Sequence, residues 1–164
     1  MKTILHLITL IAISLSFNAC THNNGDIGDL FGTWKLQSIT IDNEVDSVYQ
    51  SKNNIFWKYQ ASIVSMLQVN DTTHSRIETW GTWKYVNDGK CIEYNFTHTD
   101  NAHPQVGSEY YSPLPDTHLP KGTVFILDIL NISGDNMNLK YISEDGKQYI
   151  YKFFQVCLKM MQLL

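Results

Sequence analysis

The sequence has little positive charge and gathers none of it in one place. Its 164 residues include 12 Lys and Arg against 16 Asp and Glu, which gives a formal net charge of −4. Nucleic-acid binding depends on clustered Lys and Arg that displace counterions from phosphates. Because the basic residues are scattered singly along this chain, we expect no nucleic-acid partner.

Sequence motifs of catalysis are also missing. No serine lies in a Gly-x-Ser-x-Gly turn, and no glycine-rich loop precedes a helix that would cradle a phosphate. Neither Cys91 nor Cys157 has a histidine beside it in sequence to activate a thiolate. We therefore expect a protein that is not an enzyme and that uses no cofactor.

Long hydrophobic runs are missing apart from one at the N-terminus. About 14 mostly apolar residues, Ile4 to Phe17, follow Lys2. A membrane-spanning helix needs ~20 residues, so this run predicts an export signal that is removed. Asn18 and Ala19 then lead to Cys20. This ending resembles the bacterial lipoprotein signal, in which the chain is cut before a cysteine that carries diacylglycerol.

The resemblance implies that residues 1–20 are a lipoprotein signal peptide ending at a lipid-acceptor cysteine, Cys20. The acylated protein would be exported and held in the bacterial cell envelope as an outer-membrane lipoprotein, with the lipid membrane as its partner. The alternative is a soluble secreted protein whose signal happens to end near a cysteine.

The residues after the signal divide into three parts. Residues 21–29 are polar and rich in Gly and Asn, which predicts a flexible spacer. Residues 30–156 are long enough for a single domain with its own core. Residues 157–164 form an apolar C-terminal tail that either caps one end of the domain as a helix or is frayed. Cysteine is scarce, and spacing leaves open whether Cys91 and Cys157 pair in a disulfide or act as separate apolar residues.

Strand signals separated by turn signals recur through the domain. Asn87, Asp88 and Gly89 mark the clearest hairpin, because glycine supplies the positive φ that a tight turn needs. A change of alternation near residues 37–38 predicts a β-bulge. The predicted strands are residues 33–41, 55–59, 61–69, 76–86, 90–96, 123–132, 137–142 and 148–156. About eight strands with mostly tight connections predict an all-β fold, a single antiparallel up-and-down β-barrel.

Gly32 and Trp34 stand at the start of the first predicted strand. They resemble the Gly-x-Trp opening of lipocalins and of the lipocalin-like domains of many bacterial lipoproteins, where the indole packs across the closed end of the barrel. The same tetrapeptide, Gly-Thr-Trp-Lys, returns at residues 81–84. The resemblance implies a lipocalin-like, calycin-type barrel over residues 30–156.

One connection, residues 97–122, is much longer than the others and holds all four prolines. Loops of this length in compact domains are functional lids or are disordered, so this is where we expect specificity. It also carries His98, Asp100, His103 and His118. Their spacing matches no established zinc pattern, so we expect no metal site.

Aromatic residues are abundant, with nine Tyr, seven Phe and four Trp. Aromatic faces bind apolar and sugar-like ligands, so we expect a small apolar or amphipathic ligand in or at the mouth of the barrel. The candidate ligand-binding residues are Trp57, Tyr59, Trp80, Tyr94, Tyr110 and Tyr111. The alternative is an envelope interaction or structural module with a barrel filled by side chains, since an eight-stranded barrel has room for either.

Overall fold

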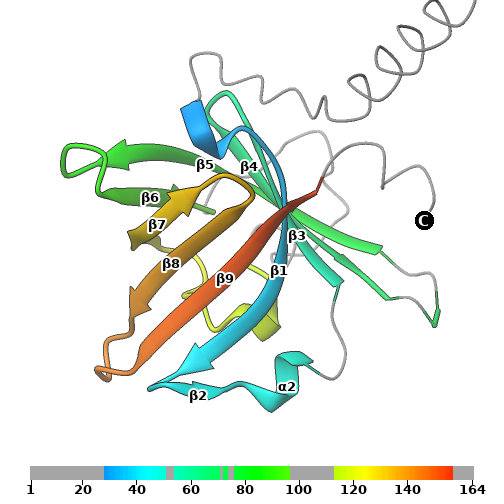
Figure 1. Ribbon diagram of the computed structural model, residues 1–164. Helices are drawn as coiled ribbons and strands as arrows, with labels where there is room; N and C mark the ends of the chain where they lie inside the picture. Colours follow the sequence, from blue (N-terminus) through cyan, green and yellow to red (C-terminus); the bar gives the residue numbers. More distant parts are fainter. Residues whose placement is uncertain (1–27, 51–53, 71, 74–75, 97–112, 157–164) are drawn as a thin grey trace, which may run out of the picture.

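The computed structural model of the chain describes residues 28–50, 54–70, 72–73, 76–96 and 113–156. One antiparallel sheet coils into a closed barrel of eight strands, in which consecutive strands are neighbours and the last pairs with the first (Figure 1). The barrel strands are β1 (Gly32–Ile41), β3 (Asn54–Gln60), β4 (Ile63–Val69), β5 (Arg76–Val86), β6 (Cys91–Asn95), β7 (Val124–Ser133), β8 (Asn136–Ile142) and β9 (Gln148–Val156). The predicted all-β fold, a single antiparallel up-and-down β-barrel, is confirmed.

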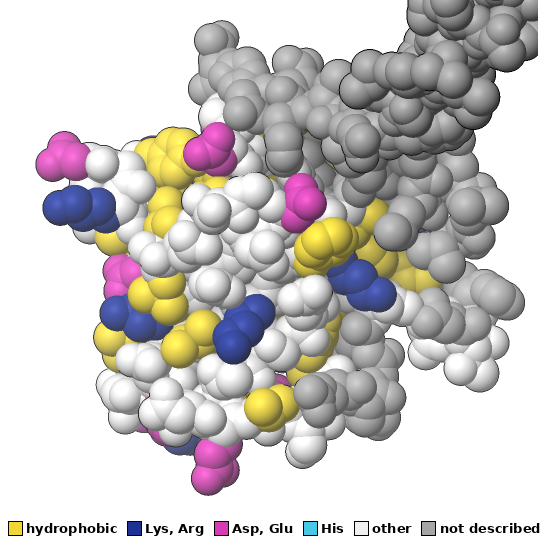
Figure 2. All heavy atoms as spheres, in the orientation of Figure 1, with side chains coloured by type: hydrophobic (Ala, Val, Ile, Leu, Met, Phe, Trp, Pro, Cys, Tyr) yellow, Lys and Arg dark blue, Asp and Glu magenta, His cyan; other side chains and the backbone are white. Residues whose placement is uncertain are grey.

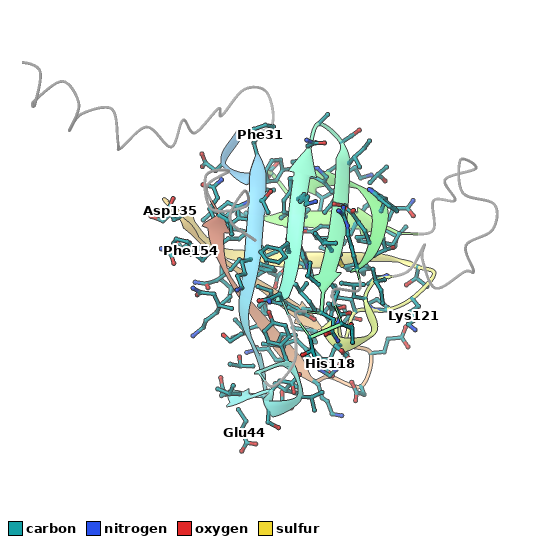
Figure 3. All side chains as sticks on the ribbon, turned by 90° about the vertical axis from the view of Figure 1, so that its right-hand side faces the viewer. Phe31, Glu44, His118, Lys121, Asp135 and Phe154 are labelled. Carbon is teal, nitrogen blue, oxygen red and sulfur yellow. The ribbon has the colours of Figure 1, made fainter. Side chains whose placement is uncertain are left out.

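Four short elements lie at the ends of the barrel. They are η1 (Gly28–Leu30), β2 (Glu44–Val45), α2 (Ser47–Gln50) and η3 (Pro115–Thr117), and none was predicted from the sequence. In the side view, Phe31 next to η1 lies at one end, whereas Glu44 of β2 and His118 after η3 lie at the other (Figure 3). No helix among the described residues has the length and apolarity needed to cross a membrane.

The predicted irregularities of the strands are largely confirmed. The register between β1 and β9 shifts between Leu36 and Ser38, where the bulge was expected. The hairpin between β5 and β6 turns through residues 87–89, which all have positive φ. The strand predicted from residue 61 is shorter than expected, because Ala61 has a φ of 46° and forms the turn that precedes Ile63.

The interior of the barrel is apolar and rich in aromatic rings. Alternate residues of each strand point inward, and most of those in the middle of the strands are buried. Trp34 is fully buried, and its indole N–H donates a hydrogen bond of 2.9 Å to the carbonyl oxygen of Leu30 in η1. This bond ties η1 to the first strand at one end of the barrel, in line with the role that the lipocalin resemblance implies for this tryptophan.

The outer surface carries charges of both signs. On the face shown in Figure 2, the Lys and Arg side chains lie apart from one another. Two ion pairs join neighbouring strands, Lys84 with Glu93 and Lys140 with Asp128, both at 2.8 Å. Exposed pairs of this kind contribute about 0–1 kcal/mol each, so the stability of the fold comes mainly from the apolar interior.

Gly81 tests how tightly this interior is packed. A β-carbon at this position would lie 2.6 Å from the carbonyl oxygen of Asn95 and 3.0 Å from the ring of Phe96. We expect Gly81→Ala to lower the free energy of unfolding by about 1–3 kcal/mol, since the backbone must shift to admit the methyl group. Urea unfolding measures this, with Thr82→Val on the outer face as a control expected within about 0.5 kcal/mol of wild type. If Gly81→Ala has the same free energy of unfolding as wild type, Gly81 is not packed as closely against Asn95 and Phe96 as the structure shows.

Candidate functional site

Three of the predicted ligand-binding residues meet inside the barrel. Trp57 and Tyr59 come from β3 and Tyr94 comes from β6, and all three are fully buried. The hydroxyl groups of Tyr59 and Tyr94 are 2.6 Å apart, within hydrogen-bonding distance. The rings of Trp57 and Tyr94 meet edge to face, with centroids 5.7 Å apart. The three side chains therefore form one aromatic wall.

Beside this wall, in the part of the chain that the structure describes, lie three buried polar atoms that have no hydrogen-bond partner. They are Trp57 Nε1, Thr79 Oγ1 and Trp83 Nε1. In the strand register Trp57 pairs with Met66, and Met66 pairs with Thr79. Trp83 lies further along the inner face of β5, where its ring meets that of Tyr59 edge to face at 5.4 Å. Trp57 and Thr79 therefore flank Met66 of β4, and Trp83 lies just beyond the start of β4, where its backbone N–H donates to the carbonyl oxygen of Ser62.

Buried polar groups in folded proteins are nearly always paired, and each exception calls for an explanation. Leaving such a group without a partner costs about 1–3 kcal/mol. The sequence pattern pointed to neither Thr79 nor Trp83 as a ligand-binding residue, although Trp83 belongs to the repeated Gly-Thr-Trp-Lys tetrapeptide. The signal that identifies them is the alternation along β5, which turns Thr79, Gly81 and Trp83 to the same side of the sheet.

The tyrosines of the wall stay uncharged at ordinary pH. Burial raises the pKa of the Tyr59 and Tyr94 hydroxyls well above the usual value of a tyrosine. One of these hydroxyls donates to the other, which leaves a single O–H of the pair free to donate elsewhere. The wall therefore offers hydrogen bonds without formal charge.

The remaining predicted site residues are not brought to this wall by the described structure. Trp80 is 37% exposed, because its position on β5 turns it to the outer surface of the barrel. The prediction that Trp80 lines the interior is therefore wrong, because the structure places this residue on the outer surface. Tyr110, Tyr111 and the expected lipid acceptor Cys20 lie outside the described residues.

Of the two cysteines that were candidates for a disulfide, the structure describes only Cys91. Its side chain is buried, and its sulfur lies 3.4 Å from Asp128 Oδ1 and 3.3 Å from Asn87 Nδ2. Cys157 lies outside the described residues. The pairing of the two cysteines therefore stays open.

The end of the barrel opposite η1 is covered by residues 113–119, a segment that we call the strap. Its side chains Leu114, Thr117 and Leu119 are buried. Tyr151, from the interior face of β9, donates a hydrogen bond of 2.8 Å to the carbonyl oxygen of Thr117. The strap is the described end of the long connection in which specificity was expected, and it closes this side of the interior.

A hydrogen bond between His118 and Asp46 holds the strap to the segment between β2 and α2. His118 Nε2 lies 2.7 Å from Asp46 Oδ2, and the His118 ring stacks on Tyr149 with centroids 5.3 Å apart. Burial would raise the pKa of the Asp46 carboxyl, but the hydrogen bonds from His118 and from the Val48 backbone outweigh it and lower this pKa below its usual value. The carboxylate is therefore the favoured form in the closed strap.

Three histidines and Asp100 in the connection of residues 97–122 are of residue types that bind metal ions. His118 is engaged with Asp46, while His98, Asp100 and His103 lie outside the described residues. Within the described ranges, no three His, Cys, Asp or Glu side chains are gathered as a metal site would need.

The Asp46 carboxylate makes the strap sensitive to acid. A carboxyl whose pKa is lower in the folded state stabilises that state above its unfolded pKa of about 3.9, and this contribution is lost as the pH falls through the folded value. We expect hydrogen-exchange protection of the Thr117 amide, which donates to Leu114, to fall below about pH 4. In Asp46→Asn the protection should be lower at pH 7 and no longer change with acid.

The matched control is Asp145→Asn, which removes an exposed turn carboxylate and should leave the protection of Thr117 at its wild-type value. If Asp46→Asn shows the same protection as wild type at pH 7, the hydrogen bond between Asp46 and His118 does not hold the strap.

Comparison with known proteins agrees with this geometry. The model of one protein family, described as a lipocalin-like domain, matches residues 13–153. No match was found among curated proteins. The family match covers most of the chain, including almost all of the barrel from β1 to β9, and a barrel of this kind suggests a capacity to bind small ligands. The chain belongs to the lipocalin-like domain family.

Proposed function

We propose that the barrel binds a small apolar or amphipathic ligand against the inner face of β4, between Trp57 and Thr79. The observation that carries the proposal is the set of three buried polar atoms without partners beside an aromatic wall. A ligand that forms hydrogen bonds with these atoms removes the penalty of leaving them unpaired. Tyr59 and Tyr94 supply the apolar contact that such sites use for affinity.

Space for this ligand has to come from the movement of a side chain. Each of the three unpaired atoms has less than 1 Å² of accessible surface, so no water-sized space adjoins them. Met66 lies between Trp57 and Thr79 in the register and is fully buried. Methionine is unbranched and has three rotatable bonds, so it repacks more readily than the rings around it.

Photolabelling with benzophenone tests the location of the site. Irradiated benzophenone inserts into nearby C–H bonds, and it contains an aromatic surface and one hydrogen-bond acceptor. We expect saturable labelling of Met66, measured by peptide mass spectrometry, because this residue lies in the strand register between the two residues Trp57 and Thr79, which carry unpaired atoms.

Met137 provides the control within the same molecule. It is also fully buried inside the barrel, but it comes from β8 and pairs with Phe153 rather than with a residue that carries an unpaired atom. Labelling of Met137 at the same level as Met66, or no saturable labelling of the interior, would contradict the proposed site.

The second candidate is an interaction or structural module with a filled barrel. The lack of water-sized space beside Trp57, Thr79 and Trp83 favours this candidate. It predicts that the interior admits no guest, so that benzophenone labels only exposed side chains such as Trp80. The distribution of the label therefore decides between the two candidates.

We also propose that the protein is exported and tethered to the outer membrane of a bacterial cell envelope through acylated Cys20. The support is the short apolar run that precedes this cysteine in the sequence. Two or more acyl chains anchor a protein stably, whereas one binds only marginally. A spacer of residues 21–29 reaches at most ~30 Å when extended, so the ligand or partner would be met close to the bilayer.

Cys20→Ala tests the tether. We expect the wild-type protein to fractionate with membranes and to carry the added mass of acyl chains on Cys20, and we expect the variant to lose both. Cys91→Ala removes a cysteine buried in the barrel and should remain in the membrane fraction. Unmodified Cys20 in the wild-type protein, measured by mass spectrometry of the intact chain, would contradict the tether.

A further inference from the structure

The inward-facing positions of the eight barrel strands carry no charged side chain within the described residues. Alternation and register turn only apolar, aromatic, glycine, Thr or Gln residues to the interior. The one charged residue that is buried in the described part of the chain is Asp46, which is outside the barrel strands and already pairs with His118. The proposed site therefore has no cation to offer a guest.

Each of the unpaired polar groups of the interior can donate a hydrogen bond. The indole N–H groups of Trp57 and Trp83 donate and cannot accept, whereas the hydroxyl of Thr79 can donate one hydrogen bond and can also accept. The hydrogen-bonded pair of Tyr59 and Tyr94 has one further O–H to donate. A guest that satisfies these groups must supply hydrogen-bond acceptors.

A guest with a negative charge would also accept hydrogen bonds, but its burial here is unfavourable. An ionised carboxylate loses several kcal/mol of hydration on burial, and this loss is compensated only where a cation or many good hydrogen bonds face it. The tyrosines of the wall stay neutral, and the barrel strands turn no described Lys, Arg or His inward. The interior therefore disfavours fatty-acid carboxylates and other anions.

From these observations we propose that the barrel selects an uncharged, aromatic or conjugated ligand that carries a carbonyl-type acceptor. The acceptor lies between Trp57 and Thr79, which flank Met66 in the strand register, and the flat part of the ligand packs on the rings of Tyr59 and Tyr94. This inference rests on the proposed function, since it names the class of ligand for the same interior site.

Two matched pairs of compounds test the class of ligand. Benzophenone and diphenylmethane share two phenyl rings and differ in the carbonyl acceptor. Methyl 4-benzoylbenzoate and 4-benzoylbenzoate differ in one negative charge. Titration calorimetry at pH 7.0 with the full chain gives the four dissociation constants. We expect about tenfold tighter binding of benzophenone than of diphenylmethane, and of the ester than of the acid, because a net hydrogen bond corresponds to about one factor of ten.

Two variants test whether the preference for benzophenone depends on the unpaired atoms of Thr79 and Trp57. Thr79→Val keeps the shape of the side chain and removes the hydroxyl, and Trp57→Phe keeps an aromatic ring and removes the N–H. We expect each to reduce the preference for benzophenone over diphenylmethane severalfold. Thr79→Val should unfold at a urea concentration no lower than wild type, since the hydroxyl has no partner to lose. Trp80→Phe on the outer surface is the control and should keep the full preference.

The outcomes separate the two proposals. If benzophenone and diphenylmethane bind equally, or if the acid binds as tightly as its ester, the inference about the ligand class is wrong while an interior binding site stands. If the preference survives in both Thr79→Val and Trp57→Phe, the acceptor lies elsewhere and the inference is also wrong. If none of the four compounds binds, the proposed function itself fails, and the inference fails with it.

Discussion

The pairing of β1 with β9 is the constraint on which the rest of the structure depends. It joins the first and last strands of the barrel, so that every barrel strand has a paired neighbour on both sides. The bulge between Leu36 and Ser38 is part of this closure, because it allows Leu36 and Ile39 both to face inward although they are three residues apart. Without closure, the aromatic interior would be one face of an open sheet.

Closure shields the interior from solvent, and a polar group that is buried there without a partner is costly. Most polar groups there find a partner in the chain itself. Trp34 donates to Leu30 at one end, and Tyr151 donates to Thr117 of the strap at the other. Trp57, Thr79 and Trp83 are the exceptions. A barrel that served only as a packed support could carry apolar side chains of similar shape at these positions, which is why we relate the exceptions to ligand binding.

The barrel was predictable from the sequence because its signals are local. Turn residues such as Gly89 mark the hairpins, and the switch in alternation on the first strand marks the bulge. The side of the sheet on which a residue lies follows from its parity once the register is known. Trp80 was assigned to the site for its aromatic ring alone, whereas its parity places it outside.

The ends of the barrel were not predictable in the same way. β2, α2 and η3 are two to four residues long and too short to leave a periodic pattern. Their positions depend on contacts between distant residues, such as the pairing of Asp46 with His118. For the same reason the sequence did not point to Thr79 or Trp83. Their lack of a partner is a property of the folded interior and not of any local motif.

The indole N–H resonances of the tryptophans test the central claim most directly, because the chain has four Trp and only two of them border the proposed site. The indole of Trp34 is already bonded to Leu30, Trp80 is on the outer surface, and Trp57 and Trp83 have buried N–H groups without partners. In a ¹H–¹⁵N spectrum assigned with single Trp→Phe variants, saturating benzophenone should shift the Trp57 and Trp83 resonances and leave those of Trp34 and Trp80 in place. A shift of Trp80 alone, or no shift of Trp57 and Trp83, would contradict a ligand site inside the barrel.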